Sequence, residues 1–542
     1  MRLQRIILSR SAGSNISCTK RVLLSTTASL RPEYGLFIDG KEVPSTSGSI
    51  SSIRNPATGE TLCSVHEGGQ EDMTKAIEVA SEAFQDGRWS GMQPRDRGRI
   101  LNRAAAILRE RIPRMAALES LQTGRCLREY NAQLARIPDW FEYHAALCQT
   151  IEGNLPPFSD DDHLAYVRRV PLGVCGLITS WNHPLLISNK KISVALAAGN
   201  TVVVKPPPPA PCSIIEMAQI LQEAGVPDGV INVVPCENTA AGRAMTTHPD
   251  MMKLDLTGGT PTGRLIGEGA GKAVKHFTAE LGGNAPILVF ADCPNGNDGT
   301  VHAIDRAVNG VCFAAFVASG QTCVSAKRIL IERSIFHEFV NKLAVKVDAL
   351  RLKNPLDLDS HIGPLVHAQA LATVESQVDA ALAEGAKVVA GGKRPTIERL
   401  GGNESLLNGH FFEPTILAIP SSGNSAFQEE IFGPVITVMP FENEAEAIKL
   451  ANDSKYGLGA GIWTSDVARA HRVARQVRAG VLWVNAHHRN DPSTPWGGFK
   501  ESGVGRENGW EAFREYTETQ SIVVRTSDEA EDWFGNPEAR YS

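Results

Sequence analysis

The chain has 542 residues, of which 42% are hydrophobic and 21% charged, and its formal net charge is −6 at pH 7. This length exceeds a single hydrophobic core and predicts two or three domains. No apolar run reaches the roughly 18 residues of a membrane-spanning helix, and no basic block outside the N-terminus favours nucleic acid as a partner. The ten cysteines are irregularly spaced without a CxxC pair, which indicates a reducing compartment and no metal site.

The first 32 residues differ in composition from the rest of the chain. They include six Lys and Arg residues and many Ser and Thr, and no Asp or Glu occurs before Glu33. An Arg- and Ser-rich segment without acids is typical of a mitochondrial transit peptide, so we expect residues 1–32 to be removed from a protein of the mitochondrial matrix. A terminus that is disordered for no functional reason is the alternative.

The remaining chain alternates between strand and helix patterns. A strand-and-turn pattern at 34–42 precedes helical patterns at about 72–86, 94–122 and 126–150. From Val174 onward short apolar strands alternate with helices, an order typical of a parallel, doubly wound sheet. The expected strands are 174–179, 201–205, 230–234 and 252–256, and the helices between them are 186–198, 212–224 and 261–270.

A second α/β unit is expected after residue 285. Its candidate strands are 286–290, 328–332, 387–390, 435–439, 460–463 and 480–485. A last apolar strand, 519–525, precedes a polar tail. An isolated strand needs a pairing partner, for which another subunit is a candidate.

A candidate nucleophile lies within the stretch from Phe313 to Arg328. The centre of this stretch, Gly320-Gln321-Thr322-Cys323, is a turn of small residues between an apolar helical run and the strand 328–332. The thiolate is the reactive form of cysteine, so a nucleophile here requires dipoles or cations that lower the thiol pKa. A buried core cysteine is the alternative, because free cysteine is among the most buried residue types.

Two further polar residues stand near strand ends. Asn182 follows the strand 174–179, at the edge where open α/β sheets bind ligands, and its amide can donate to a developing oxyanion. Glu280 precedes a Gly-Gly turn, where a carboxylate can act as a general base that activates water. The alternatives are a turn-forming asparagine and a glutamate in a surface ion pair.

Other segments have the character of a cofactor site. Lys205 ends a strand and can reach a ribose hydroxyl or a phosphate, although a solvated lysine is the commoner case. Glu430 stands two residues before Phe432, which places a carboxylate for ribose hydroxyls beside a ring for a flat heterocycle. Glycines between a strand and a helix allow the backbone to approach phosphate, but the spacing here matches neither GxGxxG nor a P-loop. These glycines are Gly258, Gly259 and Gly263.

Taken in order, these stretches resemble the aldehyde dehydrogenase superfamily from about Tyr34 to Arg525. Each motif is weak alone, but seven of them occur in the family's order and at its spacings. They are WNxP at Trp181, the Lys205-Pro strand end, TGGTPTG at Thr257, ELGGN at Glu280, GQxC at Gly320, EEIFGPV at Glu429 and PWGGFKESG at Pro495. The resemblance implies an α/β, aldehyde dehydrogenase-like fold with two doubly wound α/β domains and a small β element for oligomerisation.

The resemblance also implies domain boundaries and partners. We expect an NAD(P)-binding domain at 33–150 and 171–282, a catalytic domain at 283–503, an oligomerisation element at 151–170 and 517–527, and a polar tail at 528–542. Such elements pair exposed strands between subunits, so a homodimer or homotetramer is expected. The expected partners are then a small aldehyde as substrate and further copies of this chain, and neither nucleic acid nor a membrane is expected as a partner.

By resemblance, Cys323 attacks the aldehyde carbonyl, Asn182 and the Cys323 backbone N–H bind the oxyanion, and Glu280 activates the water that releases the acid. The alternative, a coenzyme A-acylating semialdehyde dehydrogenase, generally lacks this glutamate, so hydrolysis is favoured. A non-enzymatic relative is a third reading, but it would not need all three residues. The implied cofactor contacts are Thr179, Ser180, Trp181, Lys205, Gly258, Gly259, Gly263, Leu281, Glu430 and Phe432.

Two departures from the family pattern concern the ligands. Many relatives carry a glutamate for the adenosine ribose where this chain has Pro208. Loss of that carboxylate removes a repulsion against a 2′-phosphate, so NADP is an alternative. No arginine is evident beside Pro208 to bind the phosphate, so NAD remains the expected cofactor. The expected substrate tunnel is unusually basic, and buried basic groups require a counter-charge, so we predict a polar or anionic aldehyde unless these side chains point outward from a loop. The expected lining is His183, Ile187, Lys190, Phe316, Val317, Thr322, Val324, His487, His488, Arg489 and Trp496.

Overall fold

The computed structural model describes residues 30–159, 161–293, 303–528 and 532–535. Almost all of the expected transit peptide (1–32) and most of the expected polar tail (528–542) lie outside these residues.

An eight-stranded sheet forms the centre of the first α/β unit, in the order β19-β11-β10-β7-β8-β9-β2-β3. The strands from β11 to β9 are parallel, whereas β19 and the hairpin β2-β3 join the sheet antiparallel. The strands are β2 (Leu36–Ile38), β3 (Lys41–Val43), β7 (Val174–Ile178), β8 (Thr201–Lys205), β9 (Ile231–Val233), β10 (Met251–Thr257), β11 (His276–Glu280) and β19 (Gly503–Val504). The alternation of apolar strands and helices therefore predicted the parallel centre of this sheet.

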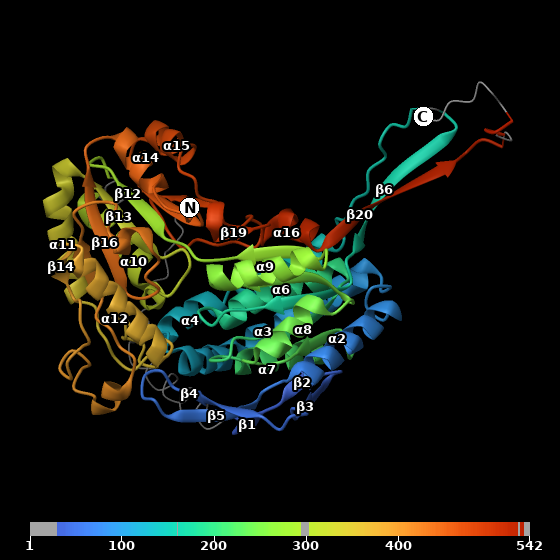
Figure 1. The fold of residues 1–542 in the computed structure, drawn as a ribbon, viewed down its shortest axis with the longest axis horizontal. Coiled ribbons are helices and arrows are strands. Elements are labelled where there is room, and N and C mark those ends of the chain that lie inside the picture. Colours follow the sequence, from blue (N-terminus) through green and yellow to red (C-terminus); the bar gives the residue numbers. More distant parts are fainter. Residues whose placement is uncertain (1–29, 160, 294–302, 529–531, 536–542) are drawn as a thin grey trace, which may run out of the picture.

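Helices surround this sheet, and its main hydrophobic core lies where α3, α5, α6 and α7 pack together (Figure 1). These helices are α2 (Gln70–Gln85), α3 (Pro94–Thr123), α4 (Leu127–Leu134), α5 (Ile137–Leu147), α6 (Pro184–Ala198), α7 (Cys212–Glu223), α8 (Thr239–Thr247), α9 (Thr260–Lys272) and α16 (Gly509–Glu515). The pattern at 126–150 forms two helices instead of one. Pro138 stands in the first turn of α5 and has no N–H to donate to the carbonyl of Leu134, so α4 ends at Leu134 and a new helix begins.

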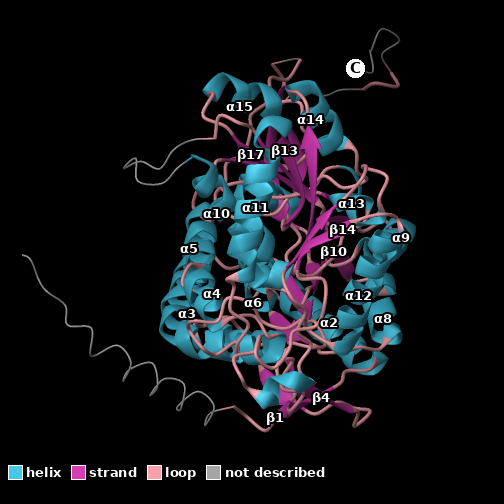
Figure 2. Ribbon diagram, turned by 90° about the vertical axis from the view of Figure 1, so that its left-hand side faces the viewer, coloured by secondary structure: helices cyan, strands magenta, loops and turns pink. Residues whose placement is uncertain are grey.

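The second α/β unit has a seven-stranded sheet in the order β14-β15-β16-β13-β12-β17-β18, in which β14 alone pairs antiparallel. Hydrophobic cores lie on both faces, one under α10 and α11 and the other under α12, α14 and α15 (Figure 2). The strands are β12 (Ala285–Val289), β13 (Ala326–Glu332), β14 (Lys387–Ala390), β15 (Thr415–Ala418), β16 (Val435–Phe441), β17 (Gly459–Trp463) and β18 (Val481–Val484). The helices are α10 (Ala303–Phe316), α11 (Phe336–Asp348), α12 (Ala368–Ala383), α13 (Ser425–Gln428), α14 (Glu444–Asn452) and α15 (Val467–Ala474).

A two-stranded ribbon projects from the body of the molecule (Figure 1). It pairs β6 (His163–Pro171) with β20 (Thr517–Arg525) antiparallel along the full length of both strands. The strand expected at 519–525 thus has a partner within its own chain. A three-stranded sheet of β1 (Glu33–Tyr34), β4 (Ile50–Arg54) and β5 (Thr61–His66) was not expected from the sequence.

The predicted fold class is confirmed, because the structure contains two α/β units with largely parallel sheets. Within the described ranges, no helix combines the length and the apolar character needed to cross a membrane.

Candidate active site

Cys323 lies in the turn between the 3-10 helix η1 (Val317–Gly320) and β13. Three residues before this turn have left-handed backbones, with φ of 54° at Ala318, 54° at Ser319 and 68° at Gly320. Residues other than glycine rarely adopt this conformation, and it persists where surrounding contacts hold it in place. The small-residue turn seen in the sequence is therefore a constrained segment that presents the thiol.

Buried hydrogen bonds hold this segment. The Nζ of Lys327 donates to the carbonyl oxygens of Gly320, at 2.8 Å, and Gly433, at 2.5 Å, and burial lowers the pKa of this lysine to about 7. The Oγ of Ser319 donates to the carbonyl of Gly363 at 2.8 Å. A Cβ on Gly320 would clash with the carbonyl oxygen of Gly433, so glycine is required here for space as well as for its backbone angle.

Asn182 and Glu280 come from the first sheet. Asn182 follows β7 and is 7% exposed, and its Oδ1 accepts a hydrogen bond from Ser180 at 2.7 Å. Glu280 ends β11 and is 2% exposed, and neither carboxyl oxygen has a hydrogen-bond partner among the described residues. A buried carboxyl without partners is costly, which is typical of a group kept for chemistry instead of stability.

The Glu280 carboxyl lies close enough to Cys323 to raise the pKa of its thiol. Burial, together with the carboxyls of Glu280 and Glu430, raises the pKa of the Cys323 thiol to about 12, against a lowering by Lys190. Burial, together with the Glu507 carboxylate, raises the pKa of Glu280 to about 8. The structure thus differs from the lowered thiol pKa that the sequence argument required, because burial outweighs the one nearby lysine. Both groups are mostly protonated at neutral pH.

The expected cofactor residues gather at the carboxyl ends of the parallel strands of the first sheet. Thr179, Ser180 and Trp181 follow β7, Lys205 ends β8, and α9 begins after Gly259 beyond β10. The amide of Gly258 donates to the carbonyl of Glu280 at 3.0 Å, so Gly258 shapes the turn. Gly263 packs against Leu281, since a Cβ at this glycine would meet the leucine side chain at 2.5 Å.

The other side of this cleft comes from the second unit. Glu430 accepts a hydrogen bond from the amide of Gly283 at 3.0 Å through Oε1, and burial raises its pKa to about 7. The ring of Phe432 packs edge-on against Trp181 with centroids 5.4 Å apart. The two units therefore meet beside the thiol.

A dinucleotide fits the residues of this cleft. The hydroxyls of Thr179, Thr257 and Thr260 are buried without a hydrogen-bond partner among the described residues. Thr260 begins α9, and the first turn of a helix offers free N–H groups and a positive dipole end to a pyrophosphate. A bound pyrophosphate would accept hydrogen bonds from these threonine hydroxyls and from the free N–H groups at the start of α9.

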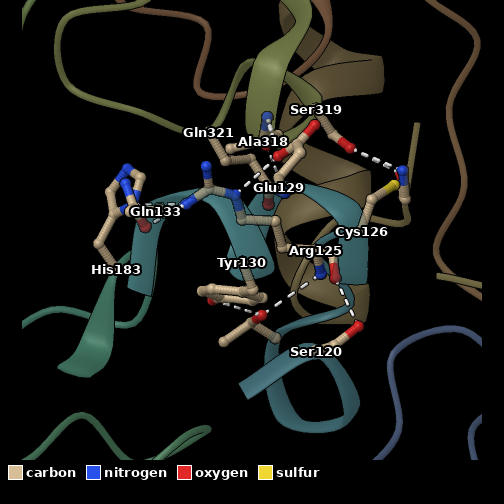
Figure 3. A network of polar contacts seen from close by, with 12 residues as sticks. Ser120, Arg125, Cys126, Glu129, Tyr130, Gln133, His183, Ala318, Ser319 and Gln321 are labelled. Atoms are coloured by element: carbon tan, nitrogen blue, oxygen red, sulfur yellow. Dashed lines mark hydrogen bonds and ion pairs between the residues drawn. The ribbon is translucent and has the colours of Figure 1, made fainter. Parts of the chain in front are cut away.

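Arg125, which precedes α4, and polar side chains of α4 form a network between the two units (Figure 3). Arg125 donates through Nε to Glu129 at 2.7 Å, and through Nη1 to Gln133 at 2.8 Å and to Nδ1 of His183 at 2.7 Å. The same Oε2 of Glu129 accepts from the amide of Ala318 at 2.9 Å. The network thus joins the residue that follows Asn182 to the turn that precedes Cys323.

Sequence reasoning missed Arg125, Glu129 and Gln133. The available signal was the spacing of Glu129 and Gln133, because residues four apart lie on one face of a helix. The apolar spacing over 126–150 predicts a helix but does not show that its polar face belongs to the site.

The buried basic groups of the expected tunnel are either paired or neutral. Lys190 is paired with Glu507 at 2.7 Å, and its ammonium lies 4.9 Å from the ring centroid of Trp496. Burial lowers the pKa of His487 to about 4, and burial also lowers the pKa of His183 and of His488 well below its ordinary value. The protein therefore supplies the counter-charge that the sequence argument assigned to a substrate.

The other expected lining residues are buried or half-buried, except Arg489, which is exposed. Ile187, Phe316, Thr322 and Val324 are buried, Val317 is half-buried, and Val324 packs with Trp496. Arg489 is exposed, which agrees with the alternative that part of this loop points outward. His487 and His488 instead donate to the carbonyls of Val324, at 2.7 Å, and Ala314, at 3.0 Å.

Comparison with known proteins gives consistent matches over nearly the whole chain. A model described as the aldehyde dehydrogenase family matches residues 43–522. The chain is 40% identical over 501 residues to a betaine aldehyde dehydrogenase of Bacillus subtilis, covering 92% of this chain and 99% of that protein. It is 36% identical to the (Z)-2-((N-methylformamido)methylene)-5-hydroxybutyrolactone dehydrogenase of Acinetobacter baylyi, covering 92% and 98%.

A solved structure shows the same fold. The chain is similar, with a TM-score of 0.89 and 34% identity, to the crystal structure of a betaine aldehyde dehydrogenase from Staphylococcus aureus in complex with NAD+, over 95% of this chain and 98% of that one.

Proposed function

This chain belongs to the aldehyde dehydrogenase family, and we propose that Cys323, Glu280 and Asn182 carry out its oxidation of an aldehyde to the carboxylic acid with NAD. The observation that carries the assignment is the buried carboxyl of Glu280, which has no described hydrogen-bond partner and lies close enough to Cys323 to raise the pKa of its thiol. A thiol and an unsatisfied carboxyl in one cleft provide a nucleophile and a base.

In the first step the Sγ of Cys323 forms a bond to the aldehyde carbon. The thiol proton is released to solvent water, so Glu280 remains the base for the later hydrolysis. The Nδ2 of Asn182 is the amide group that remains to donate to the oxyanion, because its Oδ1 already accepts from Ser180. Losing such a donor typically raises the barrier by about 3–4 kcal/mol.

Bound NAD supplies a hydride acceptor, and the protein positions it. The N-terminus of α9 and Lys205 would hold the pyrophosphate and ribose, and Glu430 and Phe432 would hold the nicotinamide side. Oε2 of Glu430 is available to ribose hydroxyls, since Oε1 accepts from Gly283. Loss of hydride from the carbon bound to Cys323 leaves a thioester on that sulfur.

Hydrolysis then requires a base beside the thioester. Glu280 takes a proton from water, and the resulting hydroxide displaces the Cys323 thiolate and releases the acid. A coenzyme A-acylating enzyme would not need this base, and none of the relatives above carries coenzyme A in its name. NAD reduction that is unaffected by coenzyme A supports hydrolysis, whereas a coenzyme A requirement would overturn it.

We propose a polar aldehyde as the substrate class. Cys323 packs against the apolar cluster of Val324 and Trp496, and the charged groups on the other sides are compensated inside the protein in the pairs Lys190–Glu507 and Arg125–Glu129. Such a lining offers hydrogen bonds to hydroxyl, carbonyl or carboxylate groups. It does not favour a quaternary ammonium, the cationic group of betaine aldehyde, because the Lys190 ammonium already occupies the face of Trp496.

A panel of aldehydes tests this specificity. We expect higher kcat/KM for hydroxylated or carboxylated aldehydes than for hexanal, and the lowest value for betaine aldehyde. Equal values for hexanal and succinate semialdehyde would contradict the proposal.

The ribbon of β6 and β20 supports a homo-oligomer. Its exposed apolar side chains include Leu164, Tyr166, Val523 and Val524, the last two 52% and 43% exposed. Exposed strand edges with apolar side chains favour pairing with another subunit, so we propose a dimer or tetramer. Light scattering should show the assembly in the wild type and its loss in Val523→Asp, and a monomeric wild type would refute it.

Residues 1–32 support a location in the mitochondrial matrix. Fusing 1–32 to a fluorescent protein should direct it to mitochondria, whereas a diffuse cytosolic signal would exclude the proposal.

A further inference from the structure

A pocket of about 900 Å³ lies on the side of the second unit, away from the cofactor cleft. It is formed by α10, α11, the start of α4 and the segment 349–362, and Figure 2 shows α10 beside α11. Its volume is within the range of small-molecule sites, which is roughly 300–1,000 Å³. Cys323, Glu280 and Asn182 do not line it, whereas Phe316 and Val317 of the expected aldehyde lining form part of its wall.

The interior of this pocket is apolar. Val308, Cys312 and Phe316 of α10 face it together with Ile362, and all four are buried. At its rim, Val345 is 73% exposed, which is unusual for an apolar side chain beside a cavity. An apolar ligand body would therefore remove exposed hydrophobic surface from water.

Cationic side chains gather at the rim. Four basic residues line one part of the pocket, namely Arg128, Lys346, Arg351 and His361. The pKa of His361 is lowered mainly by burial and further by the three cations, which shows that they lie near its ring. Arg351 donates to Nε2 of His361 at 2.8 Å. Among the described residues, Arg128 and Lys346 form no ion pair.

Arg351 is paired with Asp359 at 3.7 Å, but the acids that line the pocket do not neutralise Arg128 or Lys346. Asp305 is paired with Lys342 at 2.7 Å. Glu129 is committed to Arg125 and to the amide of Ala318. Positive charge without a partner beside an apolar cavity is the pattern that an anion with an apolar body complements.

We propose that this pocket binds an amphipathic anion, with an apolar chain against α10 and a carboxylate or phosphate head between Arg128 and Lys346. The anion site between Arg128 and Lys346 is distinct from the aldehyde site at Cys323, although the pocket shares Phe316 and Val317 with the expected aldehyde lining. Glu129 lines the pocket with one face and holds the amide of Ala318 with its carboxylate, so it stands between the ligand and the turn that carries Cys323.

Titration calorimetry with decyl phosphate, below its micelle-forming concentration, tests the proposal on the full oligomeric protein. The double variant Arg128→Gln with Lys346→Gln removes the two unpaired cations. The matched control, Lys387→Gln with Lys449→Gln, removes two exposed lysines of the same unit on β14 and α14. Val345→Glu places an acid at the rim without touching the core.

We expect the Arg128/Lys346 double variant to bind decyl phosphate at least about tenfold more weakly, since a charge-assisted contact contributes more than the 1.4 kcal/mol of one tenfold step. Val345→Glu should also weaken binding, and the control pair should bind as the wild type does. Decanol, which lacks the charge, should bind at least about tenfold more weakly than decyl phosphate. Decanoate, measured in parallel, shows whether a carboxylate serves as well as a phosphate, and either head group satisfies the proposal.

Three results would overturn the proposal. These are equal affinities of the wild type and the Arg128/Lys346 variant, equal affinities for decanol and decyl phosphate, and competition of decyl phosphate with the aldehyde in steady-state kinetics. Aldehyde oxidation is assayed separately with the same variants, which should keep wild-type kcat without decyl phosphate. A failure of this site is therefore distinguishable from a failure of the proposed chemistry.

Discussion

Replacing Glu280 by glutamine keeps the shape of the side chain but removes the base. Because the pKa of Glu280 is about 8, about one tenth of the enzyme carries the carboxylate at pH 7 and about nine tenths at pH 9. If this carboxylate activates water, hydrolysis of the thioester should speed up about tenfold between these pH values. In Glu280→Gln the steady-state rate should fall by about 10²–10⁴, the usual contribution of a general base.

Rapid mixing separates the two halves of the reaction. The variant should release one NADH per active site in a burst and then stall, whereas the wild type should continue to turn over. Steady-state turnover of Glu280→Gln within threefold of the wild type, or a wild-type hydrolysis rate that does not change from pH 7 to 9, would refute the role of Glu280.

The same substitution has a consequence for stability that does not depend on activity. The pKa of Glu280 is raised from 4.5 to about 8 in the folded protein, so the folded state binds the proton more tightly than the unfolded state. The stability that the folded protein gains from binding this proton is therefore lost as the pH rises from about 4.5 through 8. Calorimetry should show that the Tm of Glu280→Gln relative to wild type increases between pH 5 and 9, and a constant difference would contradict the raised pKa.

Three further outcomes are expected. Asn182→Ala should lower kcat by about 10²–10³ with little change in KM, and a change confined to KM would assign Asn182 to binding instead. Arg125→Met should raise KM for polar aldehydes more than for hexanal, because the hydrogen bond to His183 is lost, and an equal change for both would indicate a purely structural role. Gly320→Ala should lower Tm well beyond Gly402→Ala, since both have positive φ but only Gly320 is crowded, and similar shifts in Tm would contradict the crowding argument.

The sequence predicted the parts of the site that depend on local order. Asn182 and Glu280 stand at or just after strands whose apolar patterns were recognisable, and Cys323 stands in a turn marked by small residues. Parallel strands bring their carboxyl ends to one edge, so the residues of the first sheet could be expected together before any contact was known.

The contacts that set the electrostatics could not be predicted in this way. Lys190 meets Glu507, which is 317 residues away in the chain, and no periodic pattern connects the two. The thiol pKa also depends on total burial, which a sequence does not give, and this is why the expected lowering of the Cys323 pKa was wrong in direction. The α4 face was missed because polar residues at helical spacing are typical of a solvated surface.

The central claim, that oxidation proceeds through a thioester on Cys323, is tested most directly by mass spectrometry of the stalled Glu280→Gln enzyme. After reaction with NAD and the best aldehyde of the panel and an acid quench, we expect one acyl group per chain. The modified peptide should contain Cys323, and the adduct should be absent without NAD and in Cys323→Ala. NADH formation without an adduct, or an adduct on another residue, would contradict the account.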